Sequence, residues 1–285
     1  MVPETLLLLN VRGIERSTAL VTGGGSGIGL AIACKLASGG AHVTICGRTE
    51  EKLVRAVEII GDAAALSGFE KSRIGFAVAD VTVEAEIQRA VECSVEGIGR
   101  LDILVANAGG SFHLGSILDA DLAAVRSTVE LNLIGTWLSV KHGAKAMSDK
   151  GGSIVCISSG AGHFPHRYLW AYGMSKAGIE SLCKYAAEEL GDLGIRVNAV
   201  QPGIIDDELM SAITSGGKLL DDYISQMPLG RVGTVDDVAD AVRYLCGPES
   251  GWVTGICLPV DGGHHLRRGA NYQLLFEPTE AAPPS

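Results

Sequence analysis

Short apolar runs alternate with longer amphipathic stretches along most of this chain. The apolar runs predict seven β-strands, over residues 17–22, 41–46, 74–79, 101–106, 152–158, 195–201 and 256–260. Between them lie stretches with apolar residues at helical spacing, such as Leu53, Ala56, Val57 and Ile60. Because the runs are apolar almost throughout, both faces of each strand are expected to be buried, as in a parallel sheet covered by helices. The pattern therefore predicts a doubly wound α/β fold with about seven parallel strands.

The alternation continues to about residue 263 without a long Pro- or Ser-rich linker, which predicts a single domain over residues 13–263. Residues 1–12 are expected to be an N-terminal extension. Residues 264–285 lose the periodicity, and we expect a C-terminal extension packed on the surface or on a neighbouring subunit. A long interruption at about residues 206–231, before the last helix, is typical of a substrate lid.

Composition and charge narrow the class of protein. Of the 285 residues, 47% are hydrophobic and 20% are charged, as in soluble globular proteins. The formal charge of −10 argues against a nucleic-acid-binding protein, which would present a basic face. No apolar run approaches the length of a membrane span, and the N-terminus lacks the leading positive charge of a secretory signal. The seven cysteines form no CxxC pair, so reduced thiols in the cytoplasm are expected.

A glycine-rich segment, TGGGSGIG, follows the first strand directly and opens a helix. Such a turn lets the backbone approach a pyrophosphate, and the helix contributes N–H groups and the positive end of its dipole. Its spacing, GxxxGxG, departs from the GxGxxG fingerprint, and a Walker loop is excluded because GK[ST] is missing. The alternative is a glycine-rich turn without a ligand. The residues predicted to hold a dinucleotide here are Gly23, Gly25, Ser26, Gly27, Ile28 and Gly29.

The end of the second strand bears on the choice between NAD and NADP. An acid at this point would bind the ribose hydroxyls of NAD, but the chain has Gly47 and Arg48. The guanidinium of Arg48 can reach a 2′-phosphate, which favours NADP and leaves NAD possible. The alternative is a solvated Arg48 paired with Glu51.

Tyr172 and Lys176 are four residues apart in a predicted helix, so their side chains share one face. An ammonium close to a phenol favours the phenolate and would lower the pKa of Tyr172, as a general acid/base requires. Ser159 ends the fifth strand, at the edge where α/β folds assemble their sites, and could hold a substrate oxygen. The alternatives are an ordinary solvated pair and a turn-capping serine.

Several motifs together resemble the classical short-chain dehydrogenase/reductase family. They are TGGGSGIG at 22–29, NAG at 107–109, Ser159 ahead of YGMSK, PG at 202–203, and DGG at 261–263. They follow the expected order over residues 13–263. The resemblance implies a Rossmann fold and an NAD(P)-dependent oxidoreductase that acts on a secondary alcohol or ketone. It also implies a homotetramer or homodimer.

The resemblance implies roles for individual residues. Tyr172 would be the acid/base, Ser159 would orient the substrate oxygen, and Lys176 would bind the nicotinamide ribose. Asn132 would complete the catalytic set by holding a water in a proton relay. The remaining cofactor contacts would be Asp80 and Val81 at the adenine, Asn107, Ala108 and Gly109 along the channel, and Pro202, Gly203 and Ile205 at the nicotinamide.

The sequence departs from the family where Thr or Ser usually follows the PG pair, because this chain has Asp207. A carboxylate accepts hydrogen bonds but cannot donate one unless it is protonated. Asp206, Asp207 and Glu208 alternatively start a lid helix, since acids favour helix N-termini.

Other functions are weighed against this one. An isomerase or dehydratase on the same fold would match a different glycine spacing, and a non-catalytic redox sensor would need no catalytic tetrad. Enoyl reductases usually space Tyr and Lys more widely than YGMSK does. His264 and His265 lack a third ligand, so no metal site is expected and both are predicted to lie at the surface.

Aromatic residues between Ser159 and Tyr172 bear on the substrate. Phe164, Tyr168 and Trp170 would suit a bulky apolar alcohol or ketone if they form a wall of the site. They would equally suit a subunit contact, because aromatic side chains are enriched at interfaces.

Overall fold

The computed structural model describes residues 13–208, 210–269, 272 and 275. The predicted N-terminal extension, 1–12, lies outside the described residues. Of the predicted C-terminal extension, the structure describes 264–269, 272 and 275.

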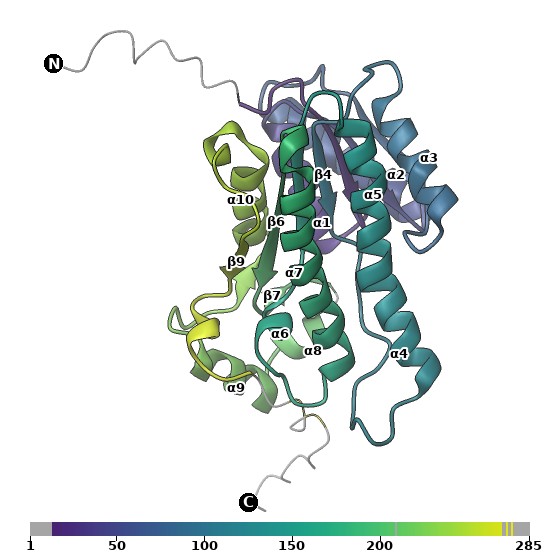
Figure 1. The fold of residues 1–285 in the computed structure, drawn as a ribbon. Helices are drawn as coiled ribbons and strands as arrows, with labels where there is room; N and C mark the ends of the chain where they lie inside the picture. Colours follow the sequence, from purple (N-terminus) through teal and green to yellow (C-terminus); the bar gives the residue numbers. More distant parts are fainter. Residues whose placement is uncertain (1–12, 209, 270–271, 273–274, 276–285) are drawn as a thin grey trace, which may run out of the picture.

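Seven parallel strands form one sheet in the order β3-β2-β1-β4-β5-β6-β9 (Figure 1). Their bounds are β1 Thr18–Thr22, β2 His42–Gly47, β3 Ile74–Val78, β4 Ile103–Ala106, β5 Gly152–Ile157, β6 Ile195–Pro202 and β9 Cys257–Val260. Each predicted strand is confirmed to within two residues. A separate two-stranded pair joins β7 (Ile205–Asp206) to β8 (Gly233–Thr234). The strand order reverses between β1 and β4, which opens a crevice at the carboxyl ends of the strands.

Helices cover both faces of the sheet, as the apolar strands predict. The main ones are α1 Gly27–Ser38, α2 Glu50–Leu66, α3 Glu84–Val95, α4 Leu122–Val129, α5 Gly135–Met147, α7 Trp170–Leu190 and α10 Val235–Cys246. Helices α1, α2 and α10 pack in one layer, and α3, α5 and α7 pack in the other. Each layer encloses its own apolar core against the sheet, so the chain is a single doubly wound domain.

Polar side chains fix the ends of several elements. At the start of β4, the buried carboxylate of Asp102 accepts a hydrogen bond from the backbone N–H of Thr18, at 2.8 Å. Helix α10 begins with a capping box in which the Thr234 hydroxyl and the Asp237 carboxylate each bond the other's backbone N–H. A π-helical turn, Glu130–Ile134, connects α4 to α5 and carries the buried Asn132.

The segment after β7 contains two short helices, α8 Ser211–Thr214 and α9 Lys218–Gln226. It encloses a small third core that includes Leu219, Tyr223 and Met227. Tyr272 from the C-terminal extension belongs to this core and is 5% exposed. The described part of the extension therefore packs on this segment of its own chain.

No helix in the described part of the chain is long and apolar enough to cross a membrane. All seven cysteines are described, and each is a free thiol.

Candidate active site

A cavity of about 990 Å³ opens at the carboxyl ends of the strands. Every residue predicted to bind the cofactor lines it, from the glycine loop to Ile205, and so do Ser159, Tyr172 and Lys176. Asn132 lies behind this lining. The crevice that the strand order creates is thus the place where the predicted residues meet.

The glycine loop has the close packing that a dinucleotide cradle requires. Gly23 and Gly27 have φ angles of 65° and 53°, in the left-handed region that favours glycine. A Cβ on Gly29 would lie 2.3 Å from the carbonyl oxygen of Gly23. No side chain larger than hydrogen fits there, so the loop presents bare backbone at the start of α1. This arrangement fits a pyrophosphate, although the same geometry also gives a tight turn.

Asn107 braces the loop from the neighbouring strand β4, and Asp80 orders a separate turn after β3. Asn107, after β4, donates from Nδ2 to the carbonyl of Thr22 at 2.9 Å, and its backbone N–H donates to the Thr22 hydroxyl at 3.0 Å. Asp80 accepts hydrogen bonds from the backbone and hydroxyl of Thr82, at 2.9 and 2.7 Å. The Asp80 carboxylate therefore shapes the turn beside the predicted adenine position.

Arg48 is exposed at the end of β2 and lines the cavity. The alternative partner, Glu51, forms no ion pair with it among the described residues. Lys52 also lines the cavity and lies 3.7 Å from the Glu208 carboxylate. Sequence reasoning missed Lys52, because a lysine in the first turn of an amphipathic helix has no distinguishing pattern.

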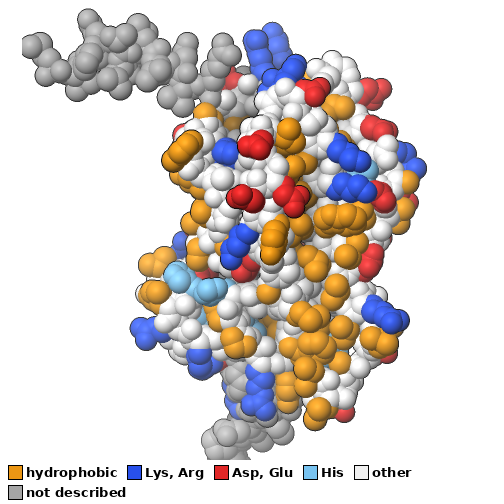
Figure 2. Space-filling view, in the orientation of Figure 1, with side chains coloured by type: hydrophobic (Ala, Val, Ile, Leu, Met, Phe, Trp, Pro, Cys, Tyr) orange, Lys and Arg blue, Asp and Glu red, His pale blue; other side chains and the backbone are white. Residues whose placement is uncertain are grey.

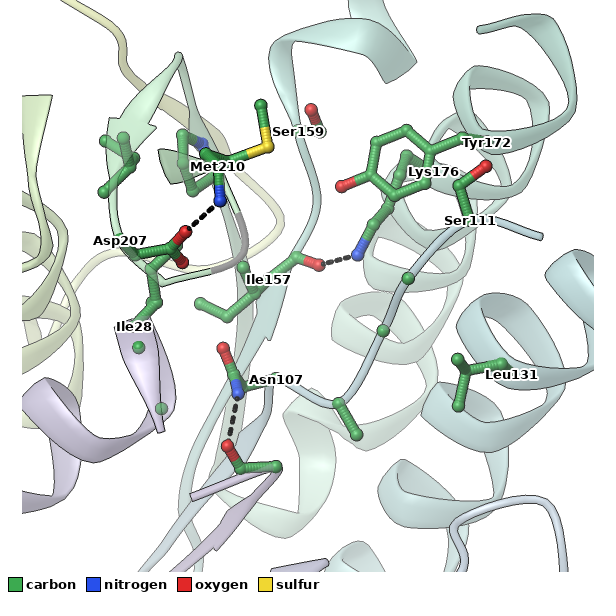
Figure 3. A pocket seen from close by; sticks show the side chains of 18 of the residues that line it. Ile28, Asn107, Ser111, Leu131, Ile157, Ser159, Tyr172, Lys176, Asp207 and Met210 are labelled. Carbon is green, nitrogen blue, oxygen red and sulfur yellow. Dashed lines mark hydrogen bonds between the residues drawn. The ribbon is translucent and has the colours of Figure 1, made fainter. Parts of the chain in front are cut away.

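Tyr172 and Lys176 project from α7 toward the cavity, and Ser159 reaches it from the end of β5 (Figure 3). The ammonium of Lys176 lies 5.4 Å from the centroid of the Tyr172 ring and donates to the carbonyl of Ile157 at 2.8 Å. The Ser159 hydroxyl accepts from the backbone N–H of Ala161 at 3.2 Å, so it also caps the short helix α6 (Gly160–His163). The structure thus brings the three predicted side chains together.

The pKa values of this pair differ from the sequence-based expectation. Desolvation raises the pKa of Tyr172 to about 12, a hydrogen bond with Ser159 lowers it in part, and nearby Tyr272 raises it further. Burial also lowers the pKa of Lys176 to about 8. The prediction that Lys176 lowers the pKa of Tyr172 is therefore not met here. Desolvation of the buried phenol is the largest cause of the shift, and the ammonium of Lys176 donates to the Ile157 carbonyl.

The side chain of Asn132 forms hydrogen bonds with the backbone at Gly110. Its Oδ1 accepts from the Gly110 N–H at 3.0 Å, and its Nδ2 donates to the carbonyls of Gly110 and Thr128 at 2.7 and 2.9 Å. A Cβ on Gly109 would lie 2.6 Å from Asn132 Oδ1 and 3.1 Å from Lys176 Nζ. Asn132 therefore fixes the backbone that passes directly beside Lys176.

Asp207 takes the position that the family usually gives to Thr or Ser. Its Oδ1 accepts from the backbone N–H of Met210 at 2.8 Å, which caps the turn leading into α8 (Figure 3). These acids do not start a helix, because Asp206 ends β7 and α8 begins at Ser211 with no acidic residue in its first turn. The carboxylate also faces the glycine loop, since a Cβ on Gly27 would lie 3.0 Å from its Oδ2.

The substrate end of the cavity differs from the prediction. Phe164, Tyr168 and Trp170 do not line it. Phe164 stacks on His166 with centroids 5.1 Å apart, and Trp170 packs edge-on against His113. These rings lie behind the wall, because the turn before α7 directs the neighbouring residues inward.

His264 was predicted to lie at the surface with His265, and this is wrong, because His264 is 1% exposed and lines the cavity. A short 3-10 turn at His264–Leu266 directs successive side chains to different sides and leaves His265 exposed. Sequence reasoning also missed His166, Tyr223 and Tyr272 as lining residues. They come from separate segments without a shared motif, so no local signal could have found them.

Comparisons with known proteins give the family of this chain. A family model described as enoyl-(acyl carrier protein) reductase matches residues 23–265. A short-chain dehydrogenase reductase of Arabidopsis thaliana is 37% identical, with 86% of this chain and 91% of the relative covered. Trans-4-hydroxycyclohexanecarboxylate dehydrogenase of Sinomonas cyclohexanicum is 36% identical, with 90% and 97% covered. A solved short-chain dehydrogenase/reductase from Mycobacterium ulcerans is 41% identical, with a TM-score of 0.88 over 92% of this chain and 94% of that one.

A Rossmann-fold sheet with a nucleotide crevice and a Ser, Tyr and Lys set defines a dinucleotide-dependent oxidoreductase. The chain belongs to the classical short-chain dehydrogenase/reductase family. Its reaction is the NAD(P)-dependent interconversion of CH–OH and carbonyl groups.

Proposed function

We propose that Tyr172 is the general acid/base of this oxidoreductase and moves the proton on the oxygen of a secondary alcohol or ketone. One observation carries the proposal: Tyr172, Lys176 and Ser159 converge from α7 and β5 on the cavity that also contains the glycine cradle. The nicotinamide cofactor, when bound, supplies or accepts the hydride.

Each neighbouring residue has a distinct part in this proposal. Ser159 donates to the substrate oxygen and holds it at the Tyr172 hydroxyl. Lys176 binds the nicotinamide ribose and keeps a positive charge beside the phenol. Asn132 acts as a positioning residue, because both polar atoms of its side chain are already bonded to Gly110 and Thr128. It supports the proton relay through the backbone that it fixes.

The residues fit a dinucleotide along the whole cavity. The backbone of the glycine loop and α1 would hold the pyrophosphate, Asp80 and Val81 would flank the adenine, and Pro202 with Gly203 would wall the nicotinamide. We assign NADP as the preferred cofactor on Arg48, whose guanidinium is unpaired with Glu51 and borders the cavity. Lys52 adds a second positive charge at the same place.

The substrate class is a cyclic secondary alcohol or the matching ketone. The similar protein from Sinomonas cyclohexanicum is named for a cyclohexane ring that carries a hydroxyl and a carboxylate. Apolar side chains of Leu169, Met210 and Ile213 line the cavity here and suit a saturated ring. The spacing of four between Tyr172 and Lys176 favours this chemistry over enoyl reduction.

The described part of residues 206–231 acts as the substrate lid in this proposal. It contributes Asp207, Met210, Ile213 and Tyr223 to the cavity wall, all from one continuous stretch. Its short helices rest on a small separate core, so the segment can move without disturbing the sheet.

We place the protein in the cytoplasm as a homodimer or homotetramer. Free thiols at all seven cysteines fit a reducing compartment. Hydrophobic side chains gather over α4, α5 and α7 (Figure 2), among them Leu122, Trp137 and Tyr185, which are 60%, 43% and 69% exposed. Such a patch is typical of a subunit interface.

The test is a turnover screen of cyclic and open-chain secondary alcohols and their ketones, followed by nicotinamide absorbance with NADP and with NAD. We expect cyclic alcohols and NADP to give the highest kcat/KM. Turnover restricted to compounds without a hydroxyl or carbonyl group would contradict the proposal.

A further inference from the structure

Four polar aromatic side chains gather at the substrate end of the cavity: His166, His264, Tyr223 and Tyr272, which we call the His–Tyr cluster. All four are buried and all line the cavity. The ring of Tyr223 lies 6.0 Å from that of His166 and 5.5 Å from that of His264, between centroids. Tyr272 is close enough to Tyr172 to raise its pKa. The cluster therefore lies beside the proposed acid/base.

The backbone fixes which nitrogen of each imidazole carries the proton. His166 Nδ1 lies 3.2 Å from the carbonyl oxygen of Phe164, and His264 Nε2 lies 2.9 Å from that of Arg268. A carbonyl only accepts, so each of these nitrogens donates. Burial lowers the pKa of His166 to about 4 and also lowers the pKa of His264, so both rings are neutral near pH 7. Each ring then keeps one acceptor nitrogen, to which no described residue donates.

The two phenols of the cluster bond to each other, with 2.7 Å between their oxygens. One hydroxyl donates in this pair, so the hydrogen of the other remains available to a ligand. The His–Tyr cluster thus offers two acceptors and one donor in a buried space. We infer that it is a subsite for a second hydroxyl group of an uncharged alcohol substrate, since a hydroxyl both donates and accepts. The inference rests on the proposed function, because it places this subsite next to Tyr172.

Charged groups fit the cluster poorly. A carboxylate has no hydrogen to give to the two acceptor nitrogens, and its burial without donors would be costly. An ammonium group on the ligand would need a carboxylate in the cluster to balance its charge. The two acids that act on the cluster electrostatically, Asp222 and Asp261, already pair with Arg268 and His265. A neutral hydroxyl remains the group that these partners satisfy.

The experiment measures binding in complexes that cannot react. Titration calorimetry, with the protein saturated with NADPH or NADH, gives Kd for cyclohexanol, for the cyclohexane-1,2-, 1,3- and 1,4-diols, and for two charged probes. The charged probes are 4-hydroxycyclohexanecarboxylate and 4-aminocyclohexanol. We expect at least one diol to bind about tenfold more tightly than cyclohexanol, which corresponds to one buried hydrogen bond. Neither charged probe should gain over cyclohexanol.

Variants connect this gain to the cluster. His166→Phe and His264→Phe should each remove most of the diol advantage and leave the Kd of cyclohexanol within about twofold. His166→Gln keeps an acceptor and should restore part of the advantage. His163→Phe is the matched control, because His163 is exposed and does not line the cavity. Thermal melts confirm that each variant is folded.

The inference is overturned if no diol binds more tightly than cyclohexanol, or if a charged probe binds best. It is also overturned if the diol advantage persists in both phenylalanine variants. Should these variants not fold, the double variant Tyr223→Phe/Tyr272→Phe takes their place, because it removes both phenolic hydroxyls of the cluster, and an unchanged ratio there has the same meaning. The proposed function fails separately, through turnover that survives in Tyr172→Phe.

Discussion

Burial governs the charges of the two central residues. Lys176 is 3% exposed, and the pKa of its ammonium falls to about 8 because a buried charge loses its hydration. Tyr172 shifts in the other direction, to about 12, for the same reason. The folded protein therefore keeps an unfavourable charge at Lys176, and we attribute its retention to the reaction.

The pH dependence of protein stability in the Lys176→Met variant tests the cost of this buried charge. Between about pH 8 and 10.5 the unfolded chain binds a proton at Lys176 that the folded chain has released, so the stability of the wild type rises with pH in this window. The variant lacks this gain. We expect the stability of the wild type relative to Lys176→Met to rise by about 2 kcal/mol between pH 8 and 10, measured by urea unfolding. A difference that is independent of pH would contradict the assignment.

Arg48→Ala tests the cofactor preference. Loss of a charge-assisted bond to the 2′-phosphate should lower kcat/KM for NADP about tenfold or more and leave that for NAD nearly unchanged. Arg55→Ala is the control. Arg55 is an exposed arginine like Arg48, but it does not line the cavity. Equal losses with both cofactors would exclude a contact of Arg48 with the phosphate.

Residues with a local motif could be predicted from the sequence, and residues assembled over long distances could not. Tyr172 and Lys176 share one helical face, so their spacing alone places them together. The cluster residues Tyr223 and Tyr272 are 49 positions apart and meet only through tertiary packing. The direction of the Tyr172 pKa shift also required the structure, because desolvation depends on everything that surrounds the ring.

At the scale of elements, the start of α1 is the most constrained part of the fold. Gly23, Gly29 and Asn107 pack so closely that a Cβ on Gly29 would lie 2.3 and 2.5 Å from its two neighbours. The sequence indicated the loop and its position after β1, since glycine is the residue that such contacts require. The bracing of the loop by Asn107 depends on the register of β1 and β4.

Gly29→Ala should therefore destabilise the protein by about 1–3 kcal/mol and weaken cofactor binding, because backbone has to move. Gly61→Ala on α2 is the matched control, since a Cβ there meets nothing within 4 Å. It should stabilise the protein by about 0.5–1 kcal/mol, as expected for alanine in a helix. Thermal melts and a fluorescence titration with NADPH measure both effects. Equal stability of the two variants would contradict the close packing of the glycine loop around Gly29.

At the scale of the whole molecule, the doubly wound arrangement of seven parallel strands follows from features that the sequence displays, because buried parallel strands need helices on both faces. The C-terminal extension could not be predicted in the same way. It lacks periodicity, yet Tyr272 completes the small core of α9 and reaches the cavity. Among the described residues, the packing of Tyr272 in this core, its hydroxyl contact with Tyr223 and the Arg268 ion pair with Asp222 hold it in position.

The exposed apolar patch over α4, α5 and α7 predicts that a charge introduced there will disrupt assembly. Trp137→Glu introduces a negative charge into the patch on α5 and should convert the oligomer to monomers, as measured by sedimentation velocity. Leu66→Glu is the control, because Leu66 is 90% exposed at the end of α2, in the opposite helix layer. An assembly that is unchanged in Trp137→Glu would place the interface elsewhere.

The central claim is that Tyr172 moves the proton, and Tyr172→Phe tests it most directly. The variant keeps the ring and removes the hydroxyl, so NADPH should bind with unchanged Kd in a fluorescence titration. We predict a loss of at least about 100-fold in kcat/KM for the best alcohol of the screen, the lower range for general acid–base catalysis. A variant that binds NADPH normally and retains wild-type turnover would contradict the account.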